Sequence, residues 1–499
     1  MIDRGDTVTN NRNAIIIGGG IGGLVASITL RQRGFDVRLY EKNNEFGGKM
    51  STLKEDGFQF DMGSSILTTP NIIGELFEKS KLNISDYIDL VRLNHQTKAF
   101  FTDGTTLALY DQVADLREYN DVISEDDIRD YEDYLGESKR MFEQSYQNYF
   151  ESNSDDFKEY RKKNPLLSMF RQRSNFISLQ SSINKFVRNP KLRELLGAMM
   201  YENGSSAYHT PAIYNVMNYL HHQHGLWYIR GGAHNLTEGL VQLAADIGVS
   251  LNNNTEVTAI EQRDNVILSI ELSTGEHVQA DYYVSNMSPV TFEQLIDEQN
   301  EKIDNYPSVT PSSFIMLLGV SKIYENINFH NVFLPKDMIQ YDKAFFTDKK
   351  LPSDLFSIVV NTSQLDKNHA LSGTQNLKVV TPIPNLNDME YTKEDFVYLR
   401  HRILSKIEQM GLEDLRSHII FEQTITPYDI QKKYHSNGGA MNGVTTDMRY
   451  NKGFKYPKQS TRFSNVYYVG SSVHPSATLS MVVLNAQQVG SMIIDESTK

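Results

Sequence analysis

Residues 14 to 23 read Ala-Ile-Ile-Ile-Gly-Gly-Gly-Ile-Gly-Gly, and this stretch predicts a buried strand followed by a tight turn. The apolar run 14–17 is typical of a parallel strand that is covered on both faces. Gly18, Gly20 and Gly23 then follow with G-x-G-x-x-G spacing. In that position after a strand, the spacing is typical of a turn that binds a dinucleotide.

The next segment completes the unit. We expect a helix over 24–33, closed by Gly34, and a second strand over 37–40. Glu41 ends that strand, where a carboxylate can accept hydrogen bonds from ribose hydroxyls. The whole strand–turn–helix–strand–Glu context is more specific than the glycines alone. The alternative is a glycine-rich loop in an ordinary α/β unit.

Each glycine has a physical reason in this interpretation. Gly18 permits the tight turn, Gly20 lets the main chain approach a pyrophosphate, and Gly23 lets the helix pack close to the strand. The first N–H groups of the helix, at the positive end of its dipole, would bind the phosphate charge.

Composition limits the other classes of function. The chain has 499 residues, enough for two or three domains, and a net charge of −13, which argues against nucleic acid as a partner. It contains no cysteine, which excludes disulfides, zinc–thiolate sites and iron–sulfur clusters. Redox chemistry would therefore need a bound cofactor to carry electrons.

The sequence predicts a cytoplasmic protein. Residues 1–12 are polar, without the apolar core of a secretory signal, and the apolar runs are too short to span a membrane. Two segments, 72–77 and 166–170, carry apolar side chains, and the second has basic neighbours. Either could dock peripherally on a bilayer, although an ordinary amphipathic helix explains them as well.

The α/β pattern returns twice along the chain, so we expect two domains with interleaved segments. The nucleotide-binding domain is predicted to combine residues 13–75, 225–290 and 430–499. Residues 76–224 and 291–429 would form a mixed α+β substrate domain, and a ligand cleft is expected between the two domains.

With these motifs the chain resembles the flavoprotein carotenoid oxidoreductases, the family of bacterial phytoene and dehydrosqualene desaturases. The resemblance extends over nearly the whole chain. Besides the glycine turn and Glu41, it rests on Gly47-Gly48-Lys49, Gly231-Gly232 and Tyr468-Val469-Gly470. It implies FAD as the cofactor and a Rossmann-type, glutathione-reductase-like domain of the α/β class. It also implies an apolar linear carotenoid as substrate.

The resemblance further implies which residues contact FAD. Together with the turn, the implied cofactor-binding residues are Gly18, Gly20, Gly23, Glu41, Lys42, Gly48, Lys49, Gly63, Ser64, Val257, Gly470, Met481 and Val482. A polyene offers no handle for an acid or a base, so we nominate no catalytic side chain.

Four stretches are similar to one branch of the family, the oxygenases that convert a terminal methyl group of the linear thirty-carbon carotenoid 4,4′-diaponeurosporene to an aldehyde. These stretches are residues 63–70, 101–106, 224–228 and 451–458. Two alternatives stay open. One is a desaturase that introduces double bonds, and the other is a flavin amine oxidase with the same nucleotide domain.

Some residues depart from the family or permit two readings. Ser476 and Thr478 replace glycines of the family, and their side chains are expected to narrow the cavity near the flavin. His474 lies in the same loop and could tune the flavin or be a solvated loop residue. Residues 221–224 read His-His-Gln-His, and we favour a polar helix end over a metal site there.

Overall fold

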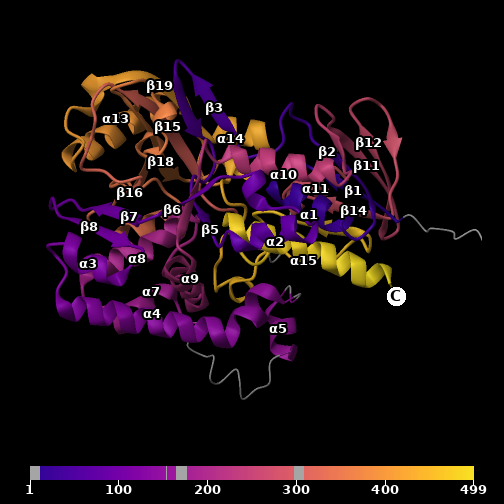
Figure 1. The fold of residues 1–499 in the computed structure, drawn as a ribbon, viewed down its shortest axis with the longest axis horizontal. Helices are drawn as coiled ribbons and strands as arrows, with labels where there is room; N and C mark the ends of the chain where they lie inside the picture. The colour runs from indigo at the N-terminus through magenta and orange to yellow at the C-terminus, as the bar shows by residue number, and fades with distance from the viewer. Residues whose placement is uncertain (1–11, 153, 155, 164–176, 297–307, 499) are drawn as a thin grey trace, which may run out of the picture.

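The computed structural model describes residues 12–152, 154, 156–163, 177–296 and 308–498. Two lobes lie side by side, each built around one large sheet (Figure 1). The first lobe holds the N-terminal strand and the C-terminal helix α15 (Leu479–Ser497). The second lobe holds the strands that come from the two middle parts of the chain.

The first lobe contains a five-stranded parallel sheet. In spatial order its strands are β10 (Ser250–Asn252), β2 (Asp36–Tyr40), β1 (Asn13–Ile17), β14 (Tyr282–Ser285) and β20 (Val466–Tyr468). Three distant segments of the chain thus meet in one sheet. The predicted fold class, a Rossmann-type α/β domain with a mixed second part, is confirmed.

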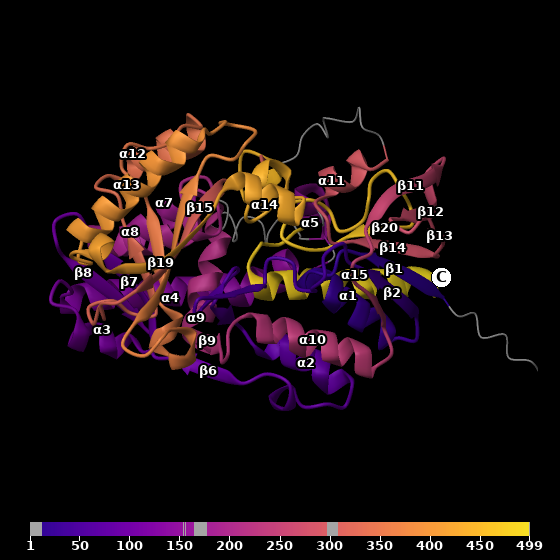
Figure 2. The same cartoon turned by 90° about the horizontal axis from the view of Figure 1, so that it is seen from above.

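Alternate side chains of β1 enter two different cores. Ala14 and Ile16 pack against helices, including α1 (Ile21–Arg31), α10 (His234–Asp246) and α15. Ile15 and Ile17 pack against the small sheet of β11 (Val257–Arg263), β12 (Val266–Leu272) and β13 (His277–Val278). Figure 2 shows α10 on one side of the parallel sheet and β11 and β12 on the other. The apolar run is therefore buried on both faces, as predicted.

Helix α1 begins at Ile21, three residues before the predicted start at Leu24. Gly22 and Gly23 are poor helix formers, which is why the sequence pattern placed them in the turn. Packing overrides this preference. A Cβ on Gly23 would lie 2.1 Å from the carbonyl oxygen of Gly18, so only glycine lets the helix lie this close to the strand.

The second lobe contains a seven-stranded mixed sheet. In spatial order its strands are β19 (Ile419–Ile425), β15 (Ser312–Val320), β18 (Gln375–Ile383), β17 (Ser357–Val360), β16 (His330–Phe333), β7 (His95–Phe100) and β8 (Thr106–Tyr110). β7 and β8 form a hairpin. Because β7 pairs with β16, the two inserted parts of the chain share one sheet. The exact domain boundaries stay a prediction.

Helices cover both faces of this sheet. α13 (Lys393–Gln409) packs on one face through Leu399 and Ile403. A layer of α4 (Glu125–Tyr146), α7 (Leu179–Phe186), α8 (Pro190–Glu202) and α9 (Val216–His224) packs on the other. Smaller strands lie beside the two lobes: β3 (Thr52–Glu55) pairs with β4 (Phe58–Asp61), and β9 (Leu226–Ile229) lies between β5 (Leu67–Thr68) and β6 (Leu90–Leu93).

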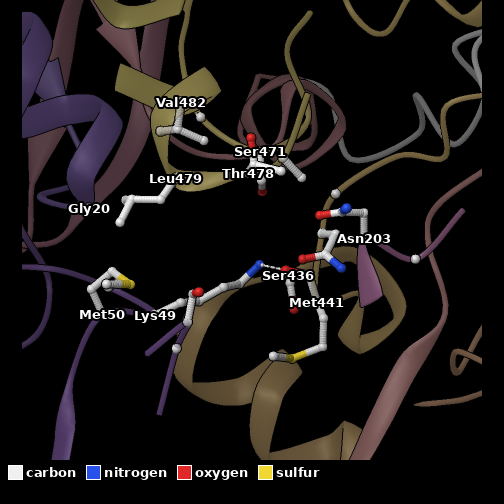
Figure 3. Close-up of a pocket in the computed structure, with 18 of the residues that line it drawn as sticks. Gly20, Lys49, Met50, Asn203, Ser436, Met441, Ser471, Thr478, Leu479 and Val482 are labelled. Atoms are coloured by element: carbon white, nitrogen blue, oxygen red, sulfur yellow. Dashed lines mark hydrogen bonds between the residues drawn. The ribbon is translucent and has the colours of Figure 1, made fainter. Parts of the chain in front are cut away.

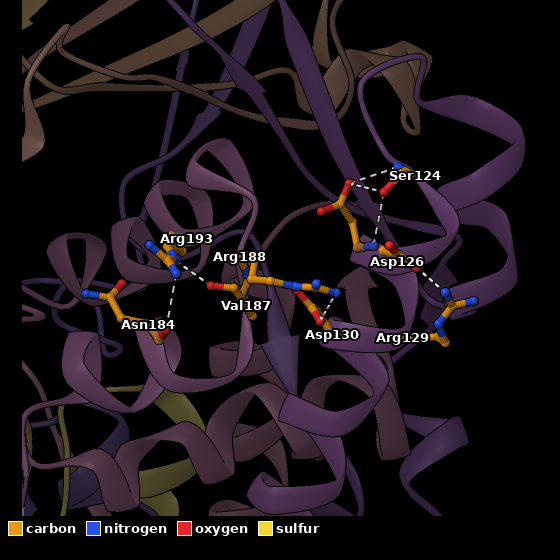
Figure 4. A network of polar contacts seen from close by, with 9 residues as sticks. Ser124, Asp126, Arg129, Asp130, Asn184, Val187, Arg188 and Arg193 are labelled. Atoms are coloured by element: carbon orange, nitrogen blue, oxygen red, sulfur yellow. Dashed lines mark hydrogen bonds and ion pairs between the residues drawn. The ribbon is translucent and has the colours of Figure 1, made fainter.

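Asp130 in α4 connects this helix to the link between α7 and α8 (Figure 4). Its carboxylate accepts hydrogen bonds from the main-chain N, Nε and Nη2 of Arg188, at 2.9, 2.9 and 3.0 Å. Arg188 follows α7, so the pair connects α4 to the link between α7 and α8. Arg188 also holds the pKa of the Asp130 carboxyl below its ordinary value, chiefly through the side-chain hydrogen bond.

The segment 72–77 does not form an exposed apolar patch. It belongs to α2 (Asn71–Lys79), where Ile73, Leu76 and Phe77 are fully buried in the core of the first lobe. The apolar face of the helix packs inward, so the segment is the ordinary amphipathic helix favoured by the sequence and not the alternative, a membrane patch. The second candidate, 166–170, lies outside the described residues. No helix among the described residues is both long enough and apolar enough to cross a membrane.

Candidate functional site

A cavity of about 520 Å³ lies where the two lobes meet, and both lobes contribute to its walls. The glycine turn and the loops that follow β2, β14 and β20 line it from the first lobe. The face of the seven-stranded sheet and the helices α7, α8 and α9 line it from the second. Figure 3 shows side chains from distant parts of the chain, among them Lys49, Met441, Thr478 and Leu479, around the same space.

The glycine turn forms a narrow cradle against Asn286, the residue after β14. Gly18 has φ +95°, which suits glycine, and its N–H donates to the Tyr40 carbonyl at 2.8 Å. A Cβ on Gly20 would lie 2.4 Å from Nδ2 of Asn286, and one on Gly22 would lie 2.5 Å from its Oδ1. Main chain without side chains therefore faces the cavity at the start of α1, as a bound diphosphate requires.

Glu41 closes this turn from the other side. Its Oε2 accepts a hydrogen bond from the Gly19 N–H at 2.8 Å, and its Oε1 accepts from the main-chain N and Nδ2 of Asn43 at 2.9 and 2.7 Å. The residue is 6% exposed and lines the cavity. Its position fits a ribose contact, and its hydrogen bonds also fix the loop that holds the turn.

All but two of the residues predicted to bind FAD line the cavity. Those at the wall are Gly18, Gly20, Glu41, Lys42, Gly48, Lys49, Gly63, Ser64, Val257, Gly470 and Val482. Gly23 is turned instead toward Gly18, and Met481 is 1% exposed in the core of the second lobe. Their positions indicate a packing role for both residues.

Lysines line the cavity, among them the half-buried Lys49 and the buried Lys378. Nζ of Lys49 donates to the Met441 carbonyl at 2.6 Å, and burial lowers its pKa to about 8. Nζ of Lys378 donates to the carbonyls of Asp61 and Gly63, at 2.8 and 2.6 Å, and burial lowers its pKa to about 8 despite the opposing charge of Asp61.

Lys455 lies next to this group. Its Nζ donates to the Ser471 carbonyl at 2.8 Å, and burial, with repulsion from Lys49, lowers its pKa to about 7. A bound anion would stabilise the charged form of such amines. Neither Lys378 nor Lys455 is among the residues predicted to bind FAD. Lys378 had a signal, because it interrupts the apolar run Leu377-Lys378-Val379-Val380 of a strand.

The C-terminal loop completes the wall near the glycine turn. Thr478 is the N-cap residue of α15 and lines the cavity, and that its side chain narrows the space near the flavin stays a prediction. Its hydroxyl is buried and has no hydrogen-bond partner among the described residues. Ser476 is also buried but does not line the cavity, so the same prediction is wrong for Ser476.

The histidines singled out in the sequence lie in different surroundings. His474 is fully buried, stacks on Phe454 with ring centroids 4.4 Å apart, and does not line the cavity. Burial lowers its pKa well below the ordinary value, so it is neither a solvated residue nor a proton donor to the cavity. His221 lines the cavity. Among the described residues, no group of three or more His, Asp or Glu could hold a metal ion.

Away from the glycine turn most of the wall is apolar, with polar side chains such as Thr97, Glu202 and His330 among the lining residues. Ile315, Ile358, Val360 and Val380 line it from three strands of the second lobe. Leu179, Leu196, Met199, Met217 and Leu226 line it from the opposite side. The cavity thus joins a dinucleotide cradle to an apolar chamber.

A glycine turn at the carboxyl end of β1, an acidic residue after β2 and an adjoining substrate chamber define a dinucleotide-dependent oxidoreductase. The model of the family described as flavin containing amine oxidoreductase matches residues 21–322, more than half of the chain. The chain belongs to this flavin-containing family, and its cofactor is FAD.

Curated relatives match almost from end to end. The chain is 39% identical to a 4,4′-diaponeurosporene oxygenase of Staphylococcus aureus (strain USA300) over 97% of its length and 98% of that protein. It is also 39% identical to one of Staphylococcus haemolyticus (strain JCSC1435), over 97% of each chain.

A solved structure shares the fold. An oxidoreductase from Methanosarcina mazei superimposes with a TM-score of 0.63 at 16% identity, covering 96% of this chain and 99% of that one.

Proposed function

We propose that this protein uses FAD to oxidise a terminal methyl group of the linear thirty-carbon carotenoid 4,4′-diaponeurosporene to an aldehyde. The observation that carries the proposal is the 39% identity, over 97% of the chain, to proteins named as oxygenases of this carotenoid. The apolar chamber beside the glycine turn supports it, because a polyene is recognised through shape and burial.

FAD, when bound, would supply the acceptor for a hydride equivalent, and the four-electron change from methyl to aldehyde takes two such oxidations and one oxygen atom from water or dioxygen. The glycine turn would hold its diphosphate at the N-terminus of α1, with Gly20 facing it. Glu41 would accept from ribose hydroxyls. Lys49 and the hydroxyl of Thr478 would contact polar groups farther along the cofactor. Gly23 and Met481 would stabilise this site by packing against the residues that line it.

The second lobe would position the substrate. Side chains such as Ile358 and Val360 would exclude water from the polyene and aim one end of it at the cofactor. No acid or base has to act on a hydrocarbon chain for this positioning. An amine substrate would need carboxylate or aromatic groups around its charge, and Glu202 and Tyr201 do line the cavity, so the case for the carotenoid rests on the identity to its named oxygenases.

We infer that the protein works on the cytoplasmic side of the membrane and touches the membrane peripherally. The reason is chemical, since a thirty-carbon polyene dissolves in lipid and must be collected from it.

The experiment is co-expression with a pathway that makes 4,4′-diaponeurosporene, followed by mass measurement of the extracted pigments. The proposal expects a product with one more oxygen and two fewer hydrogens than the substrate. A product that has lost hydrogen without gaining oxygen would show a desaturase instead. Unchanged pigment, from protein that is purified with its flavin, would overturn both.

Two glycine variants form a matched pair, one that disturbs the turn and one that is its control. Gly23→Ala disturbs the turn that would hold FAD, so it should abolish the product. Gly136→Ala lies in α4, where an added Cβ meets nothing within 4 Å, so it should leave the product in place.

A further inference from the structure

A row of four side chains crosses the second lobe's sheet along the cavity. Lys378 pairs with Val360 across β18 and β17, and Val360 pairs with His330 across β17 and β16. Thr97 on β7 follows, since its hydroxyl lies 3.2 Å from Nδ1 of His330. All four residues line the cavity. Strands in a sheet lie about 4.8 Å apart, so the row is about 14 Å long.

One end of this row is close to the cofactor cradle. A Cβ on Gly48 would lie 3.5 Å from Cα of Gly20, and one on Gly63 would lie 2.6 Å from the Lys49 carbonyl. Nζ of Lys378 donates to the carbonyl of the same Gly63. The chain of contacts therefore leads from the glycine turn to Lys378, and the opposite end of the row, at His330 and Thr97, lies on the far side of the chamber.

A polar group stands at that far end, beyond the apolar Val360. Nε2 of His330 lies 3.3 Å from Oε2 of Glu202, while its Nδ1 faces Thr97. His330 is 6% exposed and Thr97 is 5% exposed, and Glu202 also lines the cavity. A cavity built only for a hydrocarbon would gain from an apolar side chain at each of these positions.

With the imidazole proton on Nε2, the hydrogen-bonding capacity left over at this group consists of acceptors. In that tautomer the Nε2 proton is directed at the nearby carboxylate of Glu202, and Nδ1 accepts the hydroxyl proton of Thr97. The oxygen of Thr97 and the carboxylate of Glu202 then retain lone pairs that can face the cavity. The ligand group that suits them is a donor, such as an alcohol.

We propose that Thr97, His330 and Glu202 bind a hydroxyl group at one end of a linear carotenoid. The molecule then lies along the row, with its opposite, unoxidised end at the cofactor cradle. Carotenoids that already carry a terminal hydroxyl would thus be substrates of this site. The inference rests on the proposed function, because it assumes that a linear carotenoid occupies the chamber.

The test compares the Kd of two carotenoids for the FAD-loaded protein in detergent, followed by flavin fluorescence. The probes are 4,4′-diaponeurosporene and the same molecule with one terminal hydroxyl. The wild-type protein should bind the hydroxylated probe about tenfold more tightly, as expected for a hydrogen bond to a charged group. In Thr97→Val and Glu202→Gln, which keep the shape of the wall, this ratio should fall toward one.

Val360→Ala is the matched control, because it changes the same row without a polar group. It should change both affinities alike and leave their ratio as in the wild type. Retained flavin in each variant shows that the protein has folded. A ratio of one in the wild type, or a ratio unchanged in both polar variants, would overturn the inference. Failure of both carotenoids to bind would instead count against the proposed function.

Discussion

Two hydrogen bonds join Asn485 in α15 to the main chain of Gly470. Oδ1 of Asn485 accepts from the Gly470 N–H at 3.2 Å, and its Nδ2 donates to the Gly470 carbonyl at 3.1 Å. Gly470 lines the cavity with φ +107°, and Asn485 is fully buried. The C-terminal helix thereby fixes the loop after β20 at the edge of the cofactor site.

Asn485→Ala should loosen this loop. The change leaves the buried N–H of Gly470 without a partner and removes one of the two hydrogen bonds to its carbonyl, which still accepts from the Val473 N–H at 3.1 Å. It should lower the free energy of unfolding by about 2 kcal/mol. It should also weaken FAD binding, because Gly470 is no longer held against the site. Urea unfolding and the flavin content of the purified protein measure the two effects.

Ser491→Ala is the control for Asn485→Ala, since Ser491 is exposed on the same helix and bonds only to the carbonyl one turn before it. It should change stability by less than about 0.5 kcal/mol and leave the flavin content as in the wild type. Equal behaviour of the two variants would show that the pair with Gly470 does not support the site.

Gly23→Ala should disrupt the cofactor turn. The added Cβ would lie 2.1 Å from a main-chain carbonyl, so either the strand or the helix must move. We expect a loss of about 3 kcal/mol in stability, with loss of bound FAD. Gly136→Ala, in the middle of α4, should instead add up to about 1 kcal/mol and keep FAD. A yellow, stable Gly23→Ala protein would refute the packing argument.

Local patterns predicted the cofactor half of the site. The strand, turn and acidic residue of the first lobe are close in sequence, and their roles follow from backbone geometry. The start of α1 was misplaced because the low helix propensity of Gly22 and Gly23 is overridden by contact with Gly18. Propensity describes single residues, whereas this contact belongs to two elements.

Other parts of the site depend on contacts between distant residues. The partners Lys378 and Gly63 are 315 positions apart, and Thr97 and His330 are 233 apart. No period or motif in one sequence connects such positions. The burial of His474 could not be predicted for the same reason, because Phe454, whose ring stacks on it, comes from another segment.

Arg188→Met should destabilise the helical layer of the second lobe. The side chain donates two of the three hydrogen bonds that Asp130 accepts, and Asp130 is only 9% exposed (Figure 4). We expect a small but measurable loss of stability, because Arg188 is exposed while Asp130 is buried, and urea unfolding measures it. Arg129→Met is the control, because its ion pair with Asp126 is exposed on both sides and should contribute almost nothing. Equal losses would contradict the assignment.

The buried amine of Lys455 should make stability depend on pH in the alkaline range. Its pKa is about 7 in the folded protein and 10.5 in the unfolded chain, where the amine is exposed to water. Between these two pH values the unfolded chain therefore binds more protons than the folded protein. The free energy of unfolding should therefore rise with pH from about 7 to about 10. The gain is about 1 kcal/mol per pH unit, an upper value from this group.

Lys455→Met removes the titrating group, so the rise should be smaller in this variant than in the wild type. Lys49 and Lys378 contribute with the same sign from about pH 8 and remain in both proteins, which is why the difference between the two curves is the readout. Urea unfolding at about pH 7, 8 and 9, which lie between the two pKa values of Lys455, measures this difference. Lys452→Met, at an exposed lysine of the same segment, should follow the wild-type curve. If Lys455→Met follows it too, Lys455 is not the group that titrates, since a buried charge cannot be removed without changing the proton balance of folding.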